Sequence, residues 1–214
     1  MENNSGTGYF SQWKIFWPRK NFRFQFIAAV ALLISFMIFV PYFFDFVEAR
    51  SGKIIHDPFL DLLPVADVSW MIFFFLYFGV VSWLVTSVRT PDILLAGMQT
   101  YILVTFLRLC TITLFPLEPP AGYVPLTEPF VQFFTNGGKI ISKDLFFSGH
   151  MTTILFCYYN KKKGLLKTIY LLSAIAIGIL LMIQRVHYTI DIIAAPLFTW
   201  LCFLFAKKIL GKQF

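Results

Sequence analysis

Two residues four positions apart, His187 and Asp191, form the most specific chemical pattern in the sequence. At this spacing on a helix they share one face, so the carboxylate can accept a hydrogen bond from one ring nitrogen. Such a bond would fix the tautomer and leave the lone pair of the other ring nitrogen free. The pair is typical of a base or nucleophile that a carboxylate orients.

A second histidine, His150, lies in the segment KDLFFSGHMTTILF, residues 143–156. Ser148 and Gly149 precede it and introduce an apolar run, which predicts the start of a helix. Free backbone N–H groups at a helix start, together with a hydroxyl, can bind an anion. We therefore expect Ser148 and Gly149 to hold a negatively charged group close to His150.

Three further charged residues, Arg108, Asp144 and Arg185, stand in or beside apolar runs. Arginine supplies forked donors that match phosphate oxygens. Two histidines, a carboxylate, arginines and a helix start together predict phosphoryl transfer. One histidine would attack phosphorus and the other would protonate the leaving group, a scheme that requires no metal and no cofactor.

The elements that must position these residues lie in a membrane. The chain has 214 residues, is 58% hydrophobic and only 14% charged, and has a mean hydropathy of +0.73. These values indicate an integral membrane protein without a soluble domain. Its +7 formal charge is concentrated in short tracts beside apolar runs, so we interpret it as a topology signal and expect no nucleic-acid partner.

The expected fold is all-α, with six transmembrane helices in residues 24–214 and an interfacial N-terminal segment, residues 1–23, that carries Trp, Lys and Arg. No cleaved signal peptide is expected. The fourth span is short and the sixth contains Pro196, so their boundaries are the least defined. The six spans are expected at about residues 24–44, 68–88, 93–115, 146–160, 166–184 and 189–206.

Loop charges predict the orientation. With six spans both termini lie on one side, and twelve of the eighteen basic residues fall on that side, which makes it cytoplasmic. The remaining six, on the outer side, are Arg50, Lys53, Arg108, Lys139, Lys143 and Arg185. The cytoplasmic twelve are Lys14, Arg19, Lys20, Arg23, Arg89, Lys161, Lys162, Lys163, Lys167, Lys207, Lys208 and Lys212.

This orientation brings the unusual polar residues into one layer. Arg108 stands about seven residues from the outer end of the third span, which is ~10 Å below the surface at 1.5 Å per residue. The fourth and sixth spans begin outside, with His150 and His187 at their starts. The predicted site therefore faces the periplasm, the lumen or the cell exterior.

Two segments resemble a known family. DLFFSGHMTT, residues 144–153, and HYTIDIIAA, residues 187–195, are similar to the D-x-x-F-S-G-H-T and H-Y-T-x-D-x-x-x-A segments of sphingomyelin synthases. That branch belongs to the type 2 phosphatidate phosphatase superfamily. RLCTITLFPLEPP, residues 108–120, and DLLPVAD, residues 61–67, agree more weakly, so the motif region covers about residues 57–205.

The resemblance implies a role for each matching residue. His187 would be the nucleophile that forms a phosphohistidine, and Asp191 would orient it. His150 would protonate the leaving group and then activate the acceptor, with Asp144 as support for its ring. Arg108, Ser148 and Gly149 would hold phosphate, a role that the residue pattern also suggests for Arg185.

The sequence also departs from the superfamily's patterns. The K-x-x-x-x-x-x-R-P segment of the phosphatases is represented only by VRTP, residues 88–91, with Ser82 in place of the lysine. Leu181 occupies the position of an arginine six residues before the nucleophile. Ser142 and Lys143 replace the Cys-Gly of the synthase branch, where Lys143 could alter the choice of headgroup.

The partners expected for such a synthase are membrane lipids: a phospholipid donor and an acceptor of the ceramide or diacylglycerol type. A lipid phosphate phosphatase, in which water accepts the phosphate, shares the first half-reaction and stays open. A transporter is a further alternative, although the polar layer lies near one face and no inverted repeat is visible. A non-catalytic lipid-binding protein would keep the anion site without needing His150, His187 and Asp191. Whether the chain forms a homo-oligomer is left open.

The other reactive residues have simpler interpretations. Cys110, Cys157 and Cys202 each stand inside an apolar run and are expected to be small buried side chains. His56 is expected in an exposed loop. The tract Lys161–Lys163 is interpreted as charge that sets topology.

Overall fold

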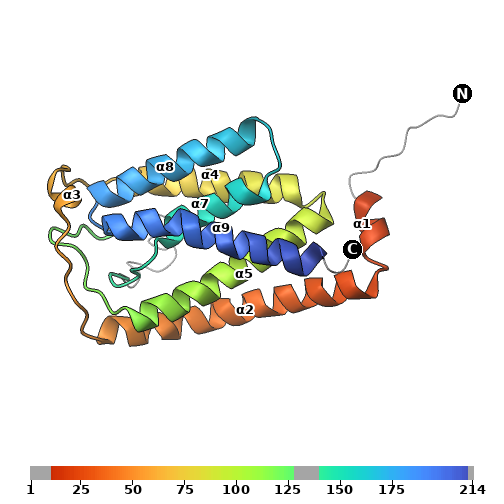
Figure 1. Cartoon of the computed structure of the whole chain (residues 1–214), viewed down its shortest axis with the longest axis horizontal. Coiled ribbons are helices and arrows are strands. Elements are labelled where there is room, and N and C mark those ends of the chain that lie inside the picture. Colours follow the sequence, from red (N-terminus) through yellow and green to blue (C-terminus); the bar gives the residue numbers. More distant parts are fainter. Residues whose placement is uncertain (1–10, 128–139, 212–214) are drawn as a thin grey trace, which may run out of the picture.

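The computed structural model describes residues 11–127 and 140–211, and within them it is all-helical apart from one isolated parallel bridge between Lys53 and Leu117. Lys139 and Lys212, which entered the charge count, lie outside these residues. Figure 1 shows the helices as a bundle of roughly aligned rods. They are α1 (Ser11–Phe16), α2 (Lys20–Ala49), α3 (Pro58–Asp61), α4 (Ser69–Ser87), α5 (Pro91–Leu114), α7 (Gly149–Asn160), α8 (Leu165–Ile183) and α9 (Thr189–Gly211).

Five of these helices, α2, α4, α5, α8 and α9, are long and apolar enough to cross a membrane. Large apolar side chains point outward from them, as lipid contact requires: Met37 is 77% exposed and Trp70 68% exposed. The multi-pass membrane protein expected from composition is supported. Helix α7 has only 12 residues, or about 18 Å of rise, which is too short to span alone. The predicted count of six spans is therefore not confirmed.

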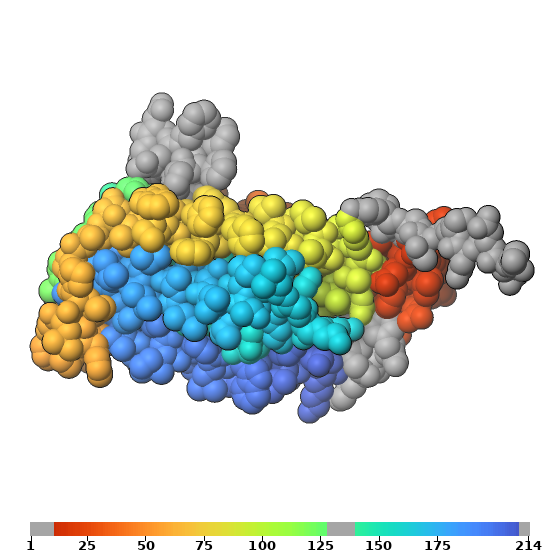
Figure 2. Space-filling view, turned by 90° about the horizontal axis from the view of Figure 1, so that it is seen from above, coloured from red at the N-terminus to blue at the C-terminus, as the bar shows by residue number. Residues whose placement is uncertain are grey.

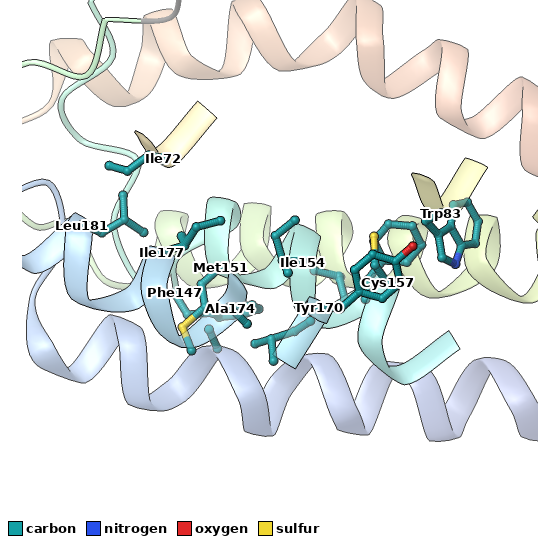
Figure 3. Close-up of a cluster of buried hydrophobic side chains, with 14 of the residues drawn as sticks. Ile72, Trp83, Phe147, Met151, Ile154, Cys157, Tyr170, Ala174, Ile177 and Leu181 are labelled. Atoms are coloured by element: carbon teal, nitrogen blue, oxygen red, sulfur yellow. The ribbon is translucent and has the colours of Figure 1, made fainter. Parts of the chain in front are cut away.

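Helix α7 is the centre of the bundle. It contacts α4, α5, α8 and α9, and most of its residues are buried. Its Ile154 packs in one core cluster with Ile72 of α4 and Ile177 of α8, as Figure 3 shows. Because neighbouring helices cover it, α7 behaves as a core helix and does not need the length of a lipid-facing span.

The bundle has two chemically different ends. Helices α7 and α9 begin toward one end, which we call the histidine end, and α8 begins at the other, the lysine end (Figure 1). Figure 2 shows α8 and α9 running side by side along the surface between these ends. The described basic residues assigned to the cytoplasm belong to the lysine end, and Arg50, Lys53, Lys143 and Arg185 to the histidine end. The structure thus reproduces the two charge groups.

Helix α2 lies at the edge of the bundle and packs mainly on α5. It begins at Lys20, four residues before the expected span. The residues ahead of it include α1, whose Trp13 donates a 2.7 Å hydrogen bond from its indole N–H to the Val88 carbonyl. This contact fixes α1 to the turn between α4 and α5.

The simpler expectations for His56 and the cysteines hold except at Cys110. His56 is exposed, and Cys157 and Cys202 are buried, whereas Cys110 is partly buried. None of these three cysteines forms a disulfide. Pro196 lies inside α9, which continues without interruption from Thr189 to Gly211, so the expected sixth span is one helix.

Candidate active site

His187 and Asp191 form the predicted pair, but they do not share a helix face as expected, because His187 lies two residues before α9 and Asp191 lies in its first turn. The ring Nδ1 of His187 lies 3.1 Å from Asp191 Oδ2, and both side chains are almost fully buried, with 1% and 0% exposure. The same carboxylate oxygen accepts a hydrogen bond of 3.2 Å from the Tyr188 backbone N–H. Since a carboxylate accepts the Nδ1 proton, the lone pair of the imidazole lies on Nε2.

The end of α8 places this pair. Arg185 adopts a left-handed backbone conformation, with φ of 56°, just beyond Gln184, the C-cap of α8. Its N–H bonds the Met182 carbonyl at 3.1 Å, and the Val186 N–H bonds the Leu181 carbonyl at 3.0 Å. These two bonds are those of a Schellman ending, where glycine is usual. The chain reverses there, and His187 follows two residues later.

Gln184 fastens this turn to the loops of the histidine end. Its side chain is fully buried, and its Oε1 accepts the Val68 N–H at 3.1 Å. Its Nε2 donates to Ser69 Oγ at 2.7 Å and to the Pro125 carbonyl at 3.1 Å. One amide therefore connects the end of α8 with the start of α4 and with the 120–127 segment.

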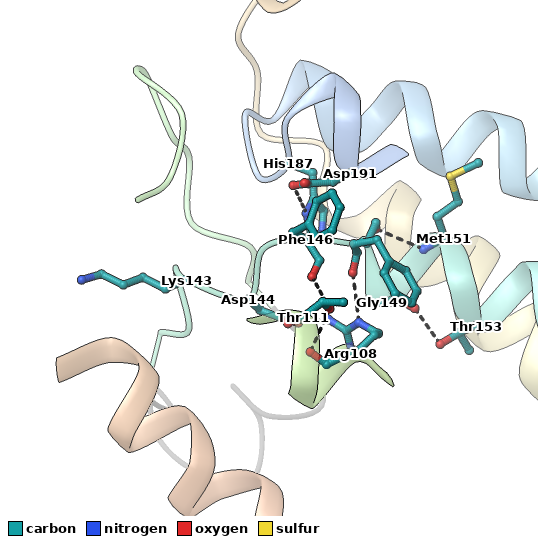
Figure 4. A network of polar contacts seen from close by, with 12 residues as sticks. Arg108, Thr111, Lys143, Asp144, Phe146, Gly149, Met151, Thr153, His187 and Asp191 are labelled. Carbon is teal, nitrogen blue, oxygen red and sulfur yellow. Dashed lines mark hydrogen bonds and ion pairs between the residues drawn. The ribbon is translucent and has the colours of Figure 1, made fainter. Parts of the chain in front are cut away.

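Arg108 of α5 reaches the beginning of α7. Its Nε donates to the Phe147 carbonyl at 3.0 Å, and its guanidinium forms an ion pair with Asp144 (Figure 4). A Cβ on Gly149 would lie 2.5 Å from Arg108 Nη1 and 2.6 Å from its Cζ. The guanidinium thus lies directly against the backbone of Gly149, and a Cβ at this position would force it to shift.

Ser148 joins the two helix starts. Its side chain is fully buried, and its Oγ accepts the Met151 N–H at 3.4 Å, which makes Ser148 the N-cap of α7. Its own N–H donates to the Asp191 carbonyl at 3.4 Å. The backbone that carries His150 is therefore held directly against the backbone that carries His187.

His150 completes the group. Its ring contacts Phe73 edge-on, with 5.9 Å between ring centroids. Among the described residues its buried Nδ1 has no hydrogen-bond partner. An unpartnered buried nitrogen is costly unless a ligand or water supplies a partner. This nitrogen is therefore available for a proton that enters or leaves the site.

Charges at the site are mutually coupled. Burial disfavours the ionised form of Asp144, but the Arg108 guanidinium outweighs burial and holds the pKa of this carboxyl below its ordinary value. His187 and His150 lie near enough for their charges to add to that effect. Asp144 is therefore an anion that neutralises the Arg108 guanidinium.

The structure brings most of the predicted site residues together but places Arg185 apart from them. It brings together Arg108, Asp144, Ser148, Gly149, His150, His187 and Asp191. Asp144 pairs with Arg108, so its described contact differs from the expected support of the His150 ring. Arg185 contacts Asp61 Oδ1 and the Leu63 carbonyl, both at 3.4 Å, and not the Arg108–Asp144 pair.

Lys143, expected to influence the headgroup, points away from Arg108 and His187 in Figure 4. Its ammonium lies 2.9 Å from Glu118 Oε1 and also donates to the Arg50 carbonyl. These contacts make Lys143 a tether of the segment before α7. The described geometry therefore gives it no direct contact with the reacting groups.

Several residues that sequence reasoning did not select hold the site in place. Thr111 donates from Oγ1 to the Phe146 carbonyl at 2.8 Å, and its position three residues after Arg108 could have identified it. Asp57 accepts from the Thr189 N–H at 2.7 Å and from its hydroxyl at 3.0 Å, which caps α9 from a distant loop. Glu48 accepts the N–H groups of Ser142 and Lys143 at 2.8 and 2.7 Å, and no local pattern predicts this contact.

Among the described residues, no group of three His, Cys, Asp or Glu side chains is arranged to hold a metal ion.

Residues 143–208 match the family model described as the C-terminal domain of the PAP2 superfamily. No curated protein and no solved structure matches the chain. The matched segment contains α7, α8 and most of α9, and with them Asp144, His150, His187 and Asp191. Over this segment, which is less than half of the chain, the sequence is similar to the type 2 phosphatidate phosphatase superfamily of lipid phosphatases and phosphotransferases, and the match does not resolve the sphingomyelin synthase-like branch.

Proposed function

We propose that the protein is an integral-membrane lipid phosphotransferase of the sphingomyelin synthase type. It would move a phospho-headgroup from a donor phospholipid to a lipid alcohol of the ceramide or diacylglycerol type. The observation that carries the proposal is the buried His187–Asp191 pair next to a guanidinium that lies on the helix start beside a second histidine. The superfamily match supports the chemistry at the coarser level of phosphorus-group transfer.

In the first half-reaction, the Nε2 lone pair of His187 attacks the phosphorus of the donor lipid. The N–P bond forms, the P–O bond to the diacylglycerol oxygen breaks, and protonated His150 gives that oxygen its proton. Asp191 stabilises the imidazolium that develops on His187. Arg108 binds the phosphate oxygens, and Asp144 keeps its guanidinium in position until they arrive.

In the second half-reaction, the hydroxyl of the acceptor lipid attacks the phosphohistidine. His150 takes the hydroxyl proton, the new P–O bond forms, and the N–P bond to His187 breaks. The enzyme returns to its starting protonation state, with His150 again carrying the proton. Water in place of the acceptor would complete a phosphatase cycle with the same residues, which is the second candidate because the superfamily contains both activities.

A lipid substrate is supported by an apolar cavity of about 760 Å³ between α2, α4, α5 and α7. Its lining on α5 ends at Thr105, three residues before Arg108, and on α7 it includes Thr153, three residues after His150. Thr153 Oγ1 also donates to the Gly149 carbonyl at 2.9 Å. A lipid chain in this cavity would therefore lead to the phosphate position.

The test uses purified full-length protein in mixed micelles with a fluorescent ceramide and, in turn, phosphatidylcholine, phosphatidylethanolamine and phosphatidylglycerol. Transfer of a headgroup to ceramide supports the synthase. Release of free phosphate from phosphatidate identifies the phosphatase. His187→Ala should abolish turnover and the acid-labile phosphoenzyme, whereas His56→Ala, at an exposed histidine outside the site, should retain both. Full activity of His187→Ala would exclude the mechanism.

A further inference from the structure

A second cavity, of about 580 Å³, opens at the lysine end of the bundle. The start of α5, the end of α7, the start of α8 and the last turns of α9 surround it. Asp191 and Lys207 are sixteen residues apart on α9, which corresponds to ~24 Å along the helix. This cavity is therefore separate from the site that contains His187.

The charges around this cavity are strongly unbalanced. Lys161, Lys162, Lys167 and Lys207 line it, and Asp92 is the one carboxylate in its lining. None of the four lysines forms an ion pair with any residue that the structure describes. Four ammonium groups around a concave, partly desolvated surface produce a positive potential that attracts an anion.

Aromatic side chains form the remaining wall. The Lys167 ammonium lies 4.8 Å from the ring centroid of Tyr158, and the Lys207 ammonium lies 5.5 Å from that of Phe203. Trp200 of α9, also in the lining, is 43% exposed. Basic and aromatic residues at the ends of spanning helices are characteristic of the level of lipid headgroups.

We propose that this cavity binds the headgroup of an anionic phospholipid. The lysines would contact the phosphate, and the acyl chains would follow the exposed apolar face of α9 below Trp200. The volume lies within the range of small-molecule sites and suits a glycerophosphate group. A soluble phosphate would use the lysines but not the apolar wall, so the aromatic lining favours a lipid. The proposal is independent of turnover at His187.

The sequence offers matched controls for this proposal. Lys162 and Lys207 line the cavity, whereas their neighbours Lys163 and Lys208 do not. Lys162→Gln/Lys207→Gln and Lys163→Gln/Lys208→Gln therefore remove the same charge from the same two tracts. All four positions are exposed, so both variants should fold, which a melting curve without added lipid would verify. Lys162→Gln alone provides a milder form of the comparison.

Binding is measured by native mass spectrometry of the full chain in detergent, titrated separately with phosphatidylglycerol, phosphatidylcholine and inorganic phosphate. Each lysine near an anionic headgroup is worth about fivefold in affinity, so the Lys162/Lys207 variant should bind phosphatidylglycerol ~25-fold more weakly. The Lys163/Lys208 variant should differ from the wild type by no more than about threefold. Because the histidine site is identical in both, lipid bound there cannot produce this difference.

Four outcomes would overturn the proposal. Equal losses in the two double variants would show attraction to general surface charge. Unchanged affinity in the Lys162/Lys207 variant would show that the cavity does not bind the lipid. Equal binding of phosphatidylcholine would remove the requirement for an anionic headgroup. Displacement of phosphatidylglycerol by an equal concentration of inorganic phosphate would identify a free-phosphate site instead.

Discussion

Replacing Gly149 by alanine would place a methyl group against the Arg108 guanidinium, which we propose binds the substrate phosphate. The new Cβ would lie 2.5 Å from Nη1, and ordinary van der Waals contact begins at 3.4 Å, so the guanidinium must withdraw by about 0.9 Å. A misplacement of ~1 Å at a positioning group can cost 10²-fold in rate. We therefore expect kcat of Gly149→Ala to fall about 100-fold.

Stability should change much less than activity. The clashing atoms are the far end of a flexible side chain, and alanine favours a helix over glycine by up to ~1 kcal/mol. Losing the hydrogen bond from Arg108 Nε to the Phe147 carbonyl would cost about as much. The two effects nearly cancel, so the free energy of unfolding should stay within about 1 kcal/mol of the wild type.

The assay is headgroup transfer in mixed micelles, combined with thermal unfolding of the same sample. Gly178→Ala is the matched control, because its Cβ would meet Ile192 Cγ2 at 3.0 Å in the apolar core and no guanidinium. The control should keep kcat close to wild type. Wild-type kcat in Gly149→Ala would refute the role of the guanidinium position, and failure to fold would refute the claim that the arginine absorbs the clash.

Three further changes test separate parts of the structure. Asp191→Asn preserves the shape of the pair but removes the charge that stabilises the His187 imidazolium, so turnover should fall ~10²–10⁴-fold with little change in melting temperature. Gln184→Leu leaves buried loop groups without hydrogen-bond partners, so it should lower the free energy of unfolding by about 2–4 kcal/mol in denaturant titrations. A loss below about 1 kcal/mol would contradict the role of the Gln184 amide in connecting the end of α8 to these loops. Burial opposes ionisation of Asp57, but hydrogen bonds from Thr189 and from the Leu60 and Phe59 N–H groups hold the pKa of this carboxyl below 3.8. Its stabilisation is therefore complete above pH ~3.8 and is lost as the pH falls through the lowered pKa, so Asp57→Asn should be less stable at pH 7 and lose less stability on acidification, as melting curves across pH would show.

Much of the architecture was readable from local patterns. Apolar runs of about 20 residues predict membrane-crossing helices because a helix satisfies its own backbone groups in lipid. Helical spacing predicted the contact between His187 and Asp191, although His187 lies two residues before α9, and the Ser148 cap follows from the residues that precede an apolar run. Charge tracts also predicted which loops share an end of the bundle. Each of these inferences needs only neighbours in the sequence.

Only the tertiary structure decided which distant groups meet. The sequence contains Arg108, Asp144 and Gly149 but does not show that one guanidinium pairs with the carboxylate and also fills the space beside the glycine. Such contacts depend on helix crossing and on the path of the loop before α7, which no local periodicity encodes. The central position of α7 is likewise tertiary, since a run of 12–15 apolar residues fits a short span and a buried core helix equally well. The neighbouring helices cover α7, which makes it a core helix and not a lipid-facing span. The same packing brings His150 and His187 into one site.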